Sequence, residues 1–201
     1  MDLQKDFGNI DIYLFDQLLK GRIQKNHRIL DAGCGGGRNS YFFLKEGFEI
    51  YGVDQNPMAI EGMREMASII APGYSSNRFK TAELSKLPYK DKSFDWIICN
   101  AVLHFANDHS HFEGMMREMW RVLKKGGIFF ARLASDIGFE GKYRDLGNGR
   151  FFLPDESERY VISEEKLLTY TEKLNAELIE RIKTTNVQNL RAMTTWVIQK
   201  N

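Results

Sequence analysis

Two rhythms of apolar residues alternate along the chain and predict alternating strands and helices. Short apolar runs of the kind that form buried parallel strands occupy 27–33, 48–54, 78–84 and 128–134. One more such run, which is the fourth of the five in chain order, starts at 94. Between them, apolar residues spaced by three or four positions predict helices over 38–47, 56–70 and 109–127. Such an alternation is typical of a parallel sheet wound in the Rossmann manner.

The two ends of the chain extend this pattern. A helix is predicted over 10–20, before Gly21, and another over 163–175. The last two predicted strands, 176–188 and 191–200, are joined tightly around Asn189 and are therefore antiparallel. We expect one α/β domain over 1–201: a Rossmann-like, seven-stranded, mostly parallel sheet with an antiparallel last strand and helices on both faces.

Charge and composition restrict the partners. The chain has 28 Lys and Arg against 27 Asp and Glu, a net charge of +1, so no nucleic-acid partner is expected. No apolar run approaches the roughly 20 residues that cross a bilayer, so no membrane partner is expected either. The N-terminal residues do not resemble a signal peptide, and the two cysteines, Cys34 and Cys99, form no disulfide framework. These features predict a cytoplasmic protein, and either a monomer or a homodimer fits them.

A glycine-rich corner follows the first strand of the Rossmann pattern. Its sequence is Asp31-x-Gly33-x-Gly35-x-Gly37. A dinucleotide fingerprint that starts at Gly33 needs its third glycine at position 38, which is Arg38 here. The acid at the strand end also repels a phosphate. The corner therefore favours a ligand with a cationic or zwitterionic head over NAD.

An acid at the end of the second strand points to a nucleoside. Asp54 lies about 20 residues beyond the glycine corner, where a carboxylate accepts hydrogen bonds from both ribose hydroxyls. S-adenosylmethionine combines such a nucleoside with an ammonium group and a sulfonium, and it has no phosphate.

With these motifs the chain resembles the class I S-adenosylmethionine-dependent methyltransferases. The resemblance covers about residues 25–134 and is carried by ILDAGCGGG, by VD at 53–54, by the stretch from Ala82 to Phe105, and by LKKGGIFF. GCGGGRNS and the chain length are also similar to the small tellurite-resistance methyltransferases. The resemblance implies methyl transfer from S-adenosylmethionine to a small-molecule acceptor, with S-adenosylhomocysteine as product.

The resemblance also implies the cofactor-binding residues. The glycine corner passes under the methionine part, Asp31 meets the methionine ammonium, and Arg38 binds either the methionine carboxylate or an anionic substrate. Asp54 binds the ribose, and Gln55 borders the adenine. Glu83 receives the adenine amino group, although many relatives have Asp there. The full expected set is Asp31, Gly33, Cys34, Gly35, Gly37, Arg38, Asp54, Gln55, Ala82, Glu83, Leu84, Asn100 and Ala101.

The residues that act on the acceptor are less defined. His104, just after the fourth strand, is the candidate general base, and its alternative role is a hydrogen-bonded pocket residue. A thiolate or similar soft acceptor needs no base, whereas a hydroxyl does. His109 and His111 are two positions apart on a predicted helix and face different directions, so no metal site is expected.

The acceptor itself should be covered by two segments. They are the N-terminal helix, taken as 9–21, and the irregular insert 135–162, which is rich in glycine, arginine and aromatic residues. The candidate substrate residues on them are Tyr13, Tyr143, Arg144 and Arg150. The alternative for the insert is a surface loop without a role in binding.

Four other functions compete with this hypothesis. Nucleic-acid methyltransferases that modify exocyclic amines resemble one another in an Asn/Asp-Pro-Pro-aromatic turn after the fourth strand. Here that place is taken by the residues from Asn100 to Leu103, which include no proline, so this function is disfavoured. A protein methyltransferase is a related alternative. A nicotinamide oxidoreductase is disfavoured by the glycine spacing. A non-catalytic S-adenosylmethionine-binding protein stays open, because binding residues alone do not separate it from an enzyme.

Overall fold

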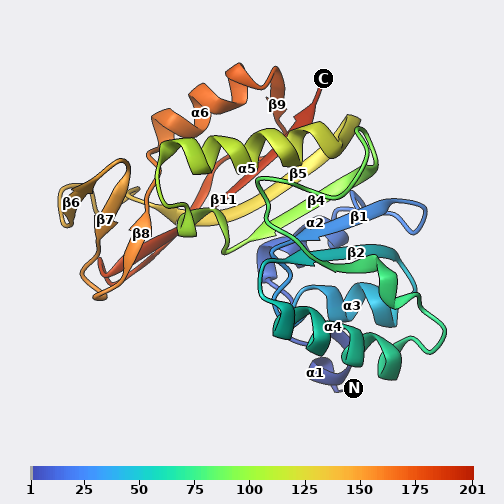
Figure 1. Cartoon of the computed structure of the whole chain (residues 1–201). Coiled ribbons are helices and arrows are strands. Elements are labelled where there is room, and N and C mark those ends of the chain that lie inside the picture. Colours follow the sequence, from blue (N-terminus) through green and yellow to red (C-terminus); the bar gives the residue numbers. More distant parts are fainter. Residues whose placement is uncertain (1) are drawn as a thin grey trace.

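A single twisted sheet runs through the structure, a computed structural model that describes residues 2–201 (Figure 1). Its order is β10-β11-β5-β4-β1-β2-β3, and β9 pairs with the same edge of β11 as β10, so eight strands fill seven places. Only β11 runs against its neighbours. The predicted fold class is confirmed. The strands are β1 (Arg28–Ala32), β2 (Glu49–Asp54), β3 (Phe79–Thr81), β4 (Phe94–Asn100), β5 (Leu123–Ser135), β9 (Ala176–Leu178), β10 (Lys183–Val187) and β11 (Arg191–Lys200).

Helices cover both faces of this sheet and form two cores with it (Figure 1). Because side chains alternate along a strand, Trp96 and Ile98 of β4 pack on one face, and Ile97 and Cys99 pack on the other. All four are buried, as the apolar sequence of a central strand predicts. The first face is covered by α2 (Ile12–Leu19), α3 (Ser40–Lys45) and α4 (Pro57–Ile70), and the second by α5 (His109–Val122) and α6 (Glu164–Lys173).

Capping residues fix several helix starts where the sequence places them. Asn56 accepts a hydrogen bond from the backbone N–H of Met58, and Pro57 takes the first position of α4. Ser163 caps α6 in the same way. The predicted end of the helix at 109–127 is wrong: α5 stops at Val122, because Leu123 is fully buried and already pairs with Phe94 in the sheet.

Three other sequence predictions need correction. The strand expected over 176–188 is two strands, because residues 179–182 leave the ladder and Glu180 turns to bind Lys20 and Arg22. The third strand is only three residues long, and the fourth ends at Asn100 before a short 3-10 turn, η2 (Leu103–Phe105); a similar turn, η1 (Ser76–Arg78), precedes β3. A first helix, α1 (Leu3–Phe7), was not predicted.

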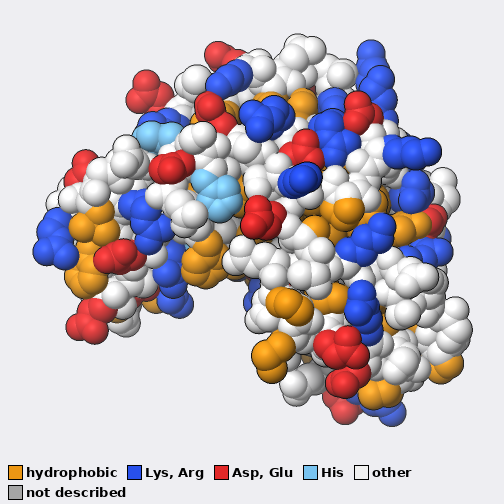
Figure 2. Space-filling view, in the orientation of Figure 1, with side chains coloured by type: hydrophobic (Ala, Val, Ile, Leu, Met, Phe, Trp, Pro, Cys, Tyr) orange, Lys and Arg blue, Asp and Glu red, His pale blue; other side chains and the backbone are white. Residues whose placement is uncertain are grey.

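The insert 135–162 is regular rather than irregular. It contains a second, antiparallel sheet of β6 (Arg144–Gly147), β7 (Arg150–Phe152) and β8 (Glu158–Tyr160). Phe139, Leu153 and Val161 of the insert are buried against Ala134 and Ala192 of the main sheet. The insert forms a lobe apart from the lobe of α3 and α4, and Figure 2 shows a notch in the outline between them.

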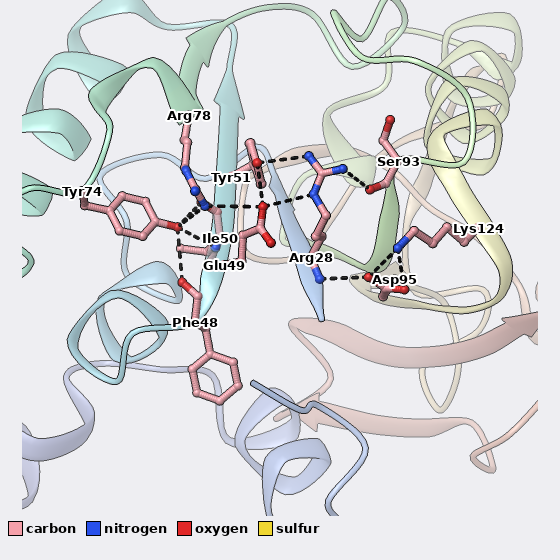
Figure 3. A network of polar contacts seen from close by, with 10 residues as sticks. All are labelled: Arg28, Phe48, Glu49, Ile50, Tyr51, Tyr74, Arg78, Ser93, Asp95 and Lys124. Atoms are coloured by element: carbon pink, nitrogen blue, oxygen red, sulfur yellow. Dashed lines mark hydrogen bonds and ion pairs between the residues drawn. The ribbon is translucent and has the colours of Figure 1, made fainter. Parts of the chain in front are cut away.

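A polar network ties together the amino ends of the central strands (Figure 3). Arg28 at the start of β1 binds Glu49 of β2 through Nε and Oε1 at 3.1 Å, and its backbone N–H donates to Asp95 of β4 at 2.9 Å. Lys124 of β5 also binds Asp95. This network occupies one edge of the sheet, so the opposite edge, at the carboxyl ends of the strands, is left for a ligand. Over residues 2–201 no helix has the length and apolar content needed to cross a membrane.

Candidate functional site

The glycine corner between β1 and α3 is fixed by the adjacent strand. The backbone N–H groups of Gly33 and Cys34 both donate to the carbonyl of Val53, at 2.8 and 2.9 Å. Gly33 has φ +77°, and a Cβ there would lie 2.4 Å from Cγ2 of Val102. Gly35 has φ +51°, yet no atom lies within 4 Å of its Cβ position. The corner is therefore packed on one side and open on the other.

Asp54 joins this corner to the end of β2. Its Oδ2 accepts a hydrogen bond from the backbone N–H of Gly35 at 2.9 Å, and its Oδ1 accepts one from Asn56 at 2.9 Å. Each carboxylate oxygen has a further lone pair, so both can still accept a hydroxyl group. The two protein contacts hold the carboxylate in place for a pair of adjacent hydroxyls.

A first cavity of about 550 Å³ lies at the carboxyl ends of β1, β2 and β4. Its size is typical of small-molecule and cofactor sites. Seven predicted cofactor residues line it together. They are Gly33, Asp54, Gln55, Ala82, Glu83, Leu84 and Ala101.

A second cavity of about 270 Å³ adjoins the first, and Ala101 lines both. Ala101 has φ +62°, a left-handed conformation that costs energy in a residue with a Cβ and often marks functional sites. The predicted residues Arg38, Asn100 and His104 line this second cavity. Nη2 of Arg38 lies 3.4 Å from Oδ1 of Asn100, while Nδ2 of Asn100 is buried without a hydrogen-bond partner in the described chain.

His104 lies in η2, and its side chain lines the second cavity. It is 5% exposed, and its Nδ1 has no hydrogen-bond partner among residues 2–201. Burial, reinforced by the charges of Arg159 and Arg191, lowers the pKa of His104 to about 4. The imidazole is therefore neutral near pH 7 and able to accept a proton, although a pKa this low makes it a weak base.

Asp31 lies behind the corner rather than in a cavity. Its side chain is 2% exposed and lines neither of the two cavities. Its Oδ2 accepts a hydrogen bond from Oγ of Ser40 at 2.7 Å. Burial raises the pKa of Asp31 to about 6. This arrangement does not place Asp31 in direct contact with a ligand.

The cysteines belong to the core. Cys34 and Cys99 are both buried, and burial raises the pKa of each thiol. Sγ of Cys34 faces Gly52, where an added Cβ would lie 2.9 Å from it. Cys34 was expected among the cofactor residues, but it lines neither cavity. The backbone of Cys34 shapes the corner, while its side chain fills space beneath β2.

The predicted substrate residues do not meet at either cavity. The hydroxyl of Tyr13 lies 2.8 Å from Oγ1 of Thr185, and its ring lies under the guanidinium of Arg132. Tyr143 binds Asp136 within the insert. The guanidinium of Arg144 lies over the ring of Phe152, which belongs to the same small sheet.

Arg150 is likewise committed elsewhere. It donates to the carbonyl of Ala106 and pairs with Glu158. Its side chain ties the insert to the turn after β4, which is a positioning contact rather than a ligand contact.

The cavities also contain residues that the sequence analysis missed. His111 and Met115, both on α5, line the first cavity. Arg132, Arg159 and Arg191 line the second cavity from three different strands. No local motif marks these arginines, because β5, β8 and β11 come together only through the sheet order.

The polar groups that line the two cavities fit the polar groups of S-adenosylmethionine. Asp54 offers a held carboxylate to a ribose, and Gly35 leaves its open side free beside it. In the second cavity, Arg38 and the unpartnered amide of Asn100 suit the carboxylate of an amino acid. A phosphate at the glycine corner would lie nearest to two acids, Asp54 and Asp31. No residue of the corner would supply a positive charge to compensate for them.

Comparison with known proteins agrees with this chemistry. The methyltransferase domain family matches residues 23–195. Uncharacterized methyltransferase YcgJ of Bacillus subtilis is 37% identical over 105 residues, which are 51% of this chain and 39% of the relative. A malonyl-[acyl-carrier protein] O-methyltransferase of Enterobacter lignolyticus is 27% identical over 54% of this chain and 40% of its own length. These alignments span less than half the length of either relative.

Solved structures share the fold. A SAM-dependent methyltransferase from Methanosarcina mazei has a TM-score of 0.70 and 21% identity, covering 91% of this chain and 96% of that one. The 1,6-didemethyltoxoflavin-N1-methyltransferase of Burkholderia thailandensis, solved with bound 1,6-didemethyltoxoflavin and S-adenosylhomocysteine, has a TM-score of 0.70 and 16% identity. It covers 100% of this chain, which covers 81% of it.

The chain thus has the fold of the solved methyltransferases, and its sequence matches a methyltransferase domain over most of its length. The chain belongs to the methyltransferase domain family. The narrower resemblance to the tellurite-resistance enzymes stays a prediction, since neither relative described above is one of them.

Proposed function

We propose that this chain transfers the methyl group of S-adenosylmethionine to a small-molecule acceptor. The observation that carries the proposal is the pair of adjoining cavities, which share Ala101 at the carboxyl end of β4. The first cavity takes the adenosine half of the cofactor. The second, smaller cavity takes the methionine head and the acceptor, so that donor and acceptor meet near the shared wall.

Each predicted residue then has a physical role. Asp54 accepts the ribose hydroxyls, and Glu83 receives the adenine amino group while Leu84 packs on the ring. Arg38 binds the methionine carboxylate, and Asn100 supplies its unpartnered amide beside it. Asp31 acts on the methionine ammonium indirectly, through Ser40 or water, because its carboxylate is buried.

The bound sulfonium supplies an activated methyl group, which an acceptor attacks in line while the electron pair of the breaking C–S bond goes to sulfur. The protein aligns the acceptor and excludes water. A thiolate-like acceptor attacks without a base. A hydroxyl acceptor must lose a proton, and the neutral imidazole of His104 is the group in the second cavity that takes it.

The insert completes the acceptor site as one of its walls. Leu153 and Ser157 of the insert line the second cavity, and Arg159 follows on β8. The insert is folded around its own small core, so it covers the site as a formed unit rather than as a random loop. The names of two proteins described above, a malonyl-[acyl-carrier protein] O-methyltransferase and a 1,6-didemethyltoxoflavin-N1-methyltransferase, support a small acceptor here.

Calorimetry with S-adenosylhomocysteine tests the cofactor part. Asp54→Ala should weaken binding by about 1.5–3 kcal/mol, the range for hydrogen bonds to a charged group. Asp91→Ala is the control, because Asp91 is an exposed acid that lines neither cavity. Unchanged affinity in Asp54→Ala, or micromolar binding of NADH, would overturn the proposal. Transfer of a labelled methyl group to a panel of acceptors then separates an enzyme from a protein that only binds the cofactor.

A further inference from the structure

We propose that the second cavity binds a small organic acid as the methyl acceptor and that Arg159 and Arg191 hold its carboxylate. The proposal rests on the proposed function, because it names the chemical class of the acceptor at that site. It depends on three observations: the charge of the cavity wall, the buried polar groups that lack partners, and the apolar residues opposite the arginines.

The wall of the cavity has an excess of positive charge. Four arginines and one aspartate line it: Arg38, Arg132, Arg159, Arg191 and Asp155. Arg132 is neutralised by Asp11 at 2.6 Å, and Arg191 lies 3.5 Å from Asp155. Within residues 2–201, Arg38 and Arg159 have no carboxylate at ion-pair distance. Arg38 and Arg159 are therefore left for ligands, and the exposed Arg191, whose contact with Asp155 is long and weak, can turn to a ligand as well.

The two free arginines belong to different parts of the ligand site. Arg38 follows the glycine corner and contacts Asn100, so it serves the methionine carboxylate of the cofactor. Arg159 comes from β8 of the insert, and its guanidinium stacks on Phe105 at 4.9 Å. Arg191 begins β11 and its side chain is 55% exposed. Arg159 and Arg191 thus reach the cavity wall from β8 and β11, which are separate from the glycine corner.

Buried polar side chains that lack a hydrogen-bond partner belong to the same wall. Asn100 and His104 are 8% and 5% exposed and line the cavity, and Nδ2 of Asn100 and Nδ1 of His104 have no hydrogen-bond partner in the described chain. Nε of Arg132 is a third such atom. Unmade hydrogen bonds of buried groups are costly, so the amide of Asn100 and Nε of Arg132 favour a ligand that brings acceptor oxygens to this wall.

The remaining wall is apolar. Ala134, Leu153, Ala192 and Met193 line it. An inorganic anion would leave these apolar side chains in contact with water. An organic acid instead places its carboxylate at the arginines and its apolar body against this wall. The volume of about 270 Å³ lies below the usual range of sites for drug-sized ligands, so the acid is small.

Benzoate and its uncharged analogue benzamide test the charge requirement. Each is titrated into the wild-type protein with and without saturating S-adenosylhomocysteine, and binding is followed by calorimetry and by the ring signals of His104 in NMR spectra. We expect benzoate to bind at least about tenfold more tightly than benzamide, because a charge-assisted hydrogen bond is lost with the neutral ligand. The signals of His104 should shift on benzoate addition, because its ring lines the same cavity.

Variants test the residues. Arg159→Gln and Arg191→Gln should each weaken benzoate binding by about tenfold. Arg144→Gln should not, because Arg144 is exposed on β6 and lines neither cavity, although it removes the same charge from the same insert. A circular dichroism spectrum confirms that each variant is folded.

Four results would overturn the inference. They are no benzoate binding, equal affinity for benzoate and benzamide, equal losses in Arg159→Gln and Arg144→Gln, or competition between benzoate and S-adenosylhomocysteine, which would assign the cavity to the cofactor alone. Failure of S-adenosylhomocysteine to bind at all contradicts the proposed function instead. The titrations without it still decide whether the arginines bind an acid.

Discussion

Asp11 and Arg132 form a buried ion pair beside the second cavity, with 2.6 Å between Oδ2 and Nη1. Asp11 also caps α2 by accepting from the backbone N–H of Tyr13, and its own N–H donates to the side chain of Asn39. The carboxylate and the backbone N–H of this one residue thus join α2, the start of α3 and β5. Burial opposes ionisation, but the hydrogen bond and charge of Arg132 outweigh it and hold the pKa of Asp11 below its usual value.

Loss of this carboxylate should destabilise the fold. Asp11→Ala leaves the guanidinium of Arg132 partly buried without a counter-charge, so we expect a loss of about 3 kcal/mol, the lower end for a broken buried pair. Asp16→Ala is the control, because Asp16 is 36% exposed and its pairs with lysines are worth less than about 1 kcal/mol. Urea unfolding measures both, and equal losses would show that the pair has no special role.

Two glycines of the corner should respond differently to alanine. Gly33→Ala combines a left-handed backbone with a Cβ 2.4 Å from the stiff side chain of Val102, so we expect a loss of about 3 kcal/mol or more. Gly35→Ala has the backbone cost alone, about 1–2 kcal/mol, because its Cβ position is free. Thermal unfolding of the two variants gives the comparison. Similar losses would mean that Val102 moves away without cost.

The sequence predicted what depends on local pattern. Strand and helix periodicity gave the sheet and its two helical faces, and the motif at Asp31 to Gly37 with Asp54 gave the residues around the first cavity. The antiparallel pairing of the last two strands followed from the tight turn around Asn189, whose φ is +57° in the structure.

What it missed depends on packing between distant segments. Leu123 belongs to a strand rather than to the preceding helix because Phe94 pairs with it, and helix spacing does not reveal that partner. The insert has no long apolar period, yet three short strands form because a few of its apolar side chains, such as Phe139, are buried against β5 and β11. The arginines of the second cavity were likewise misassigned: Arg144 and Arg150 are on the insert but outside the cavity, whereas Arg159 is inside.

Asp31 should make stability depend on pH. Its pKa is raised to about 6 in the folded state from an ordinary value of 3.8, so the folded state holds the proton more tightly. The corresponding stability is present below about pH 4 and is lost as pH rises through about 6, by roughly 3 kcal/mol in total. Asp31→Asn removes this charge and keeps an acceptor for Ser40.

The Asp31→Asn variant should therefore be more stable than the wild type above about pH 6 and equal to it below about pH 4. Urea unfolding across this range measures the difference. A variant that is less stable at high pH would mean that the ionised carboxylate has partners beyond Ser40. Calorimetry with S-adenosylhomocysteine on the same variant shows what the buried carboxylate contributes to cofactor binding.

His104 should titrate far below an ordinary histidine. Burial and the charges of Arg159 and Arg191 lower its pKa to about 4, so the folded state binds its proton less tightly than the unfolded chain does. The stability that depends on neutral His104 is complete above about pH 6.5 and is lost as pH falls through about 4. NMR titration should show its ring signals constant from about pH 8 to 5.5. Arg159→Gln should raise the pKa by removing one of the two charges, and Arg144→Gln should leave it unchanged.

The same residue gives a kinetic prediction once an acceptor is known. If the acceptor is a hydroxyl, His104→Ala should lower kcat by roughly 10²–10⁴ with unchanged affinity for S-adenosylhomocysteine, and the acidic limb of the wild-type kcat/KM profile should lie near pH 4 rather than 6.5. If the acceptor is a soft atom or a carboxylate that is already ionised, no proton is removed and the loss should stay below about tenfold. An acidic limb near pH 6.5 in the free enzyme would assign proton removal to a group other than the buried imidazole, because His104 is already neutral there.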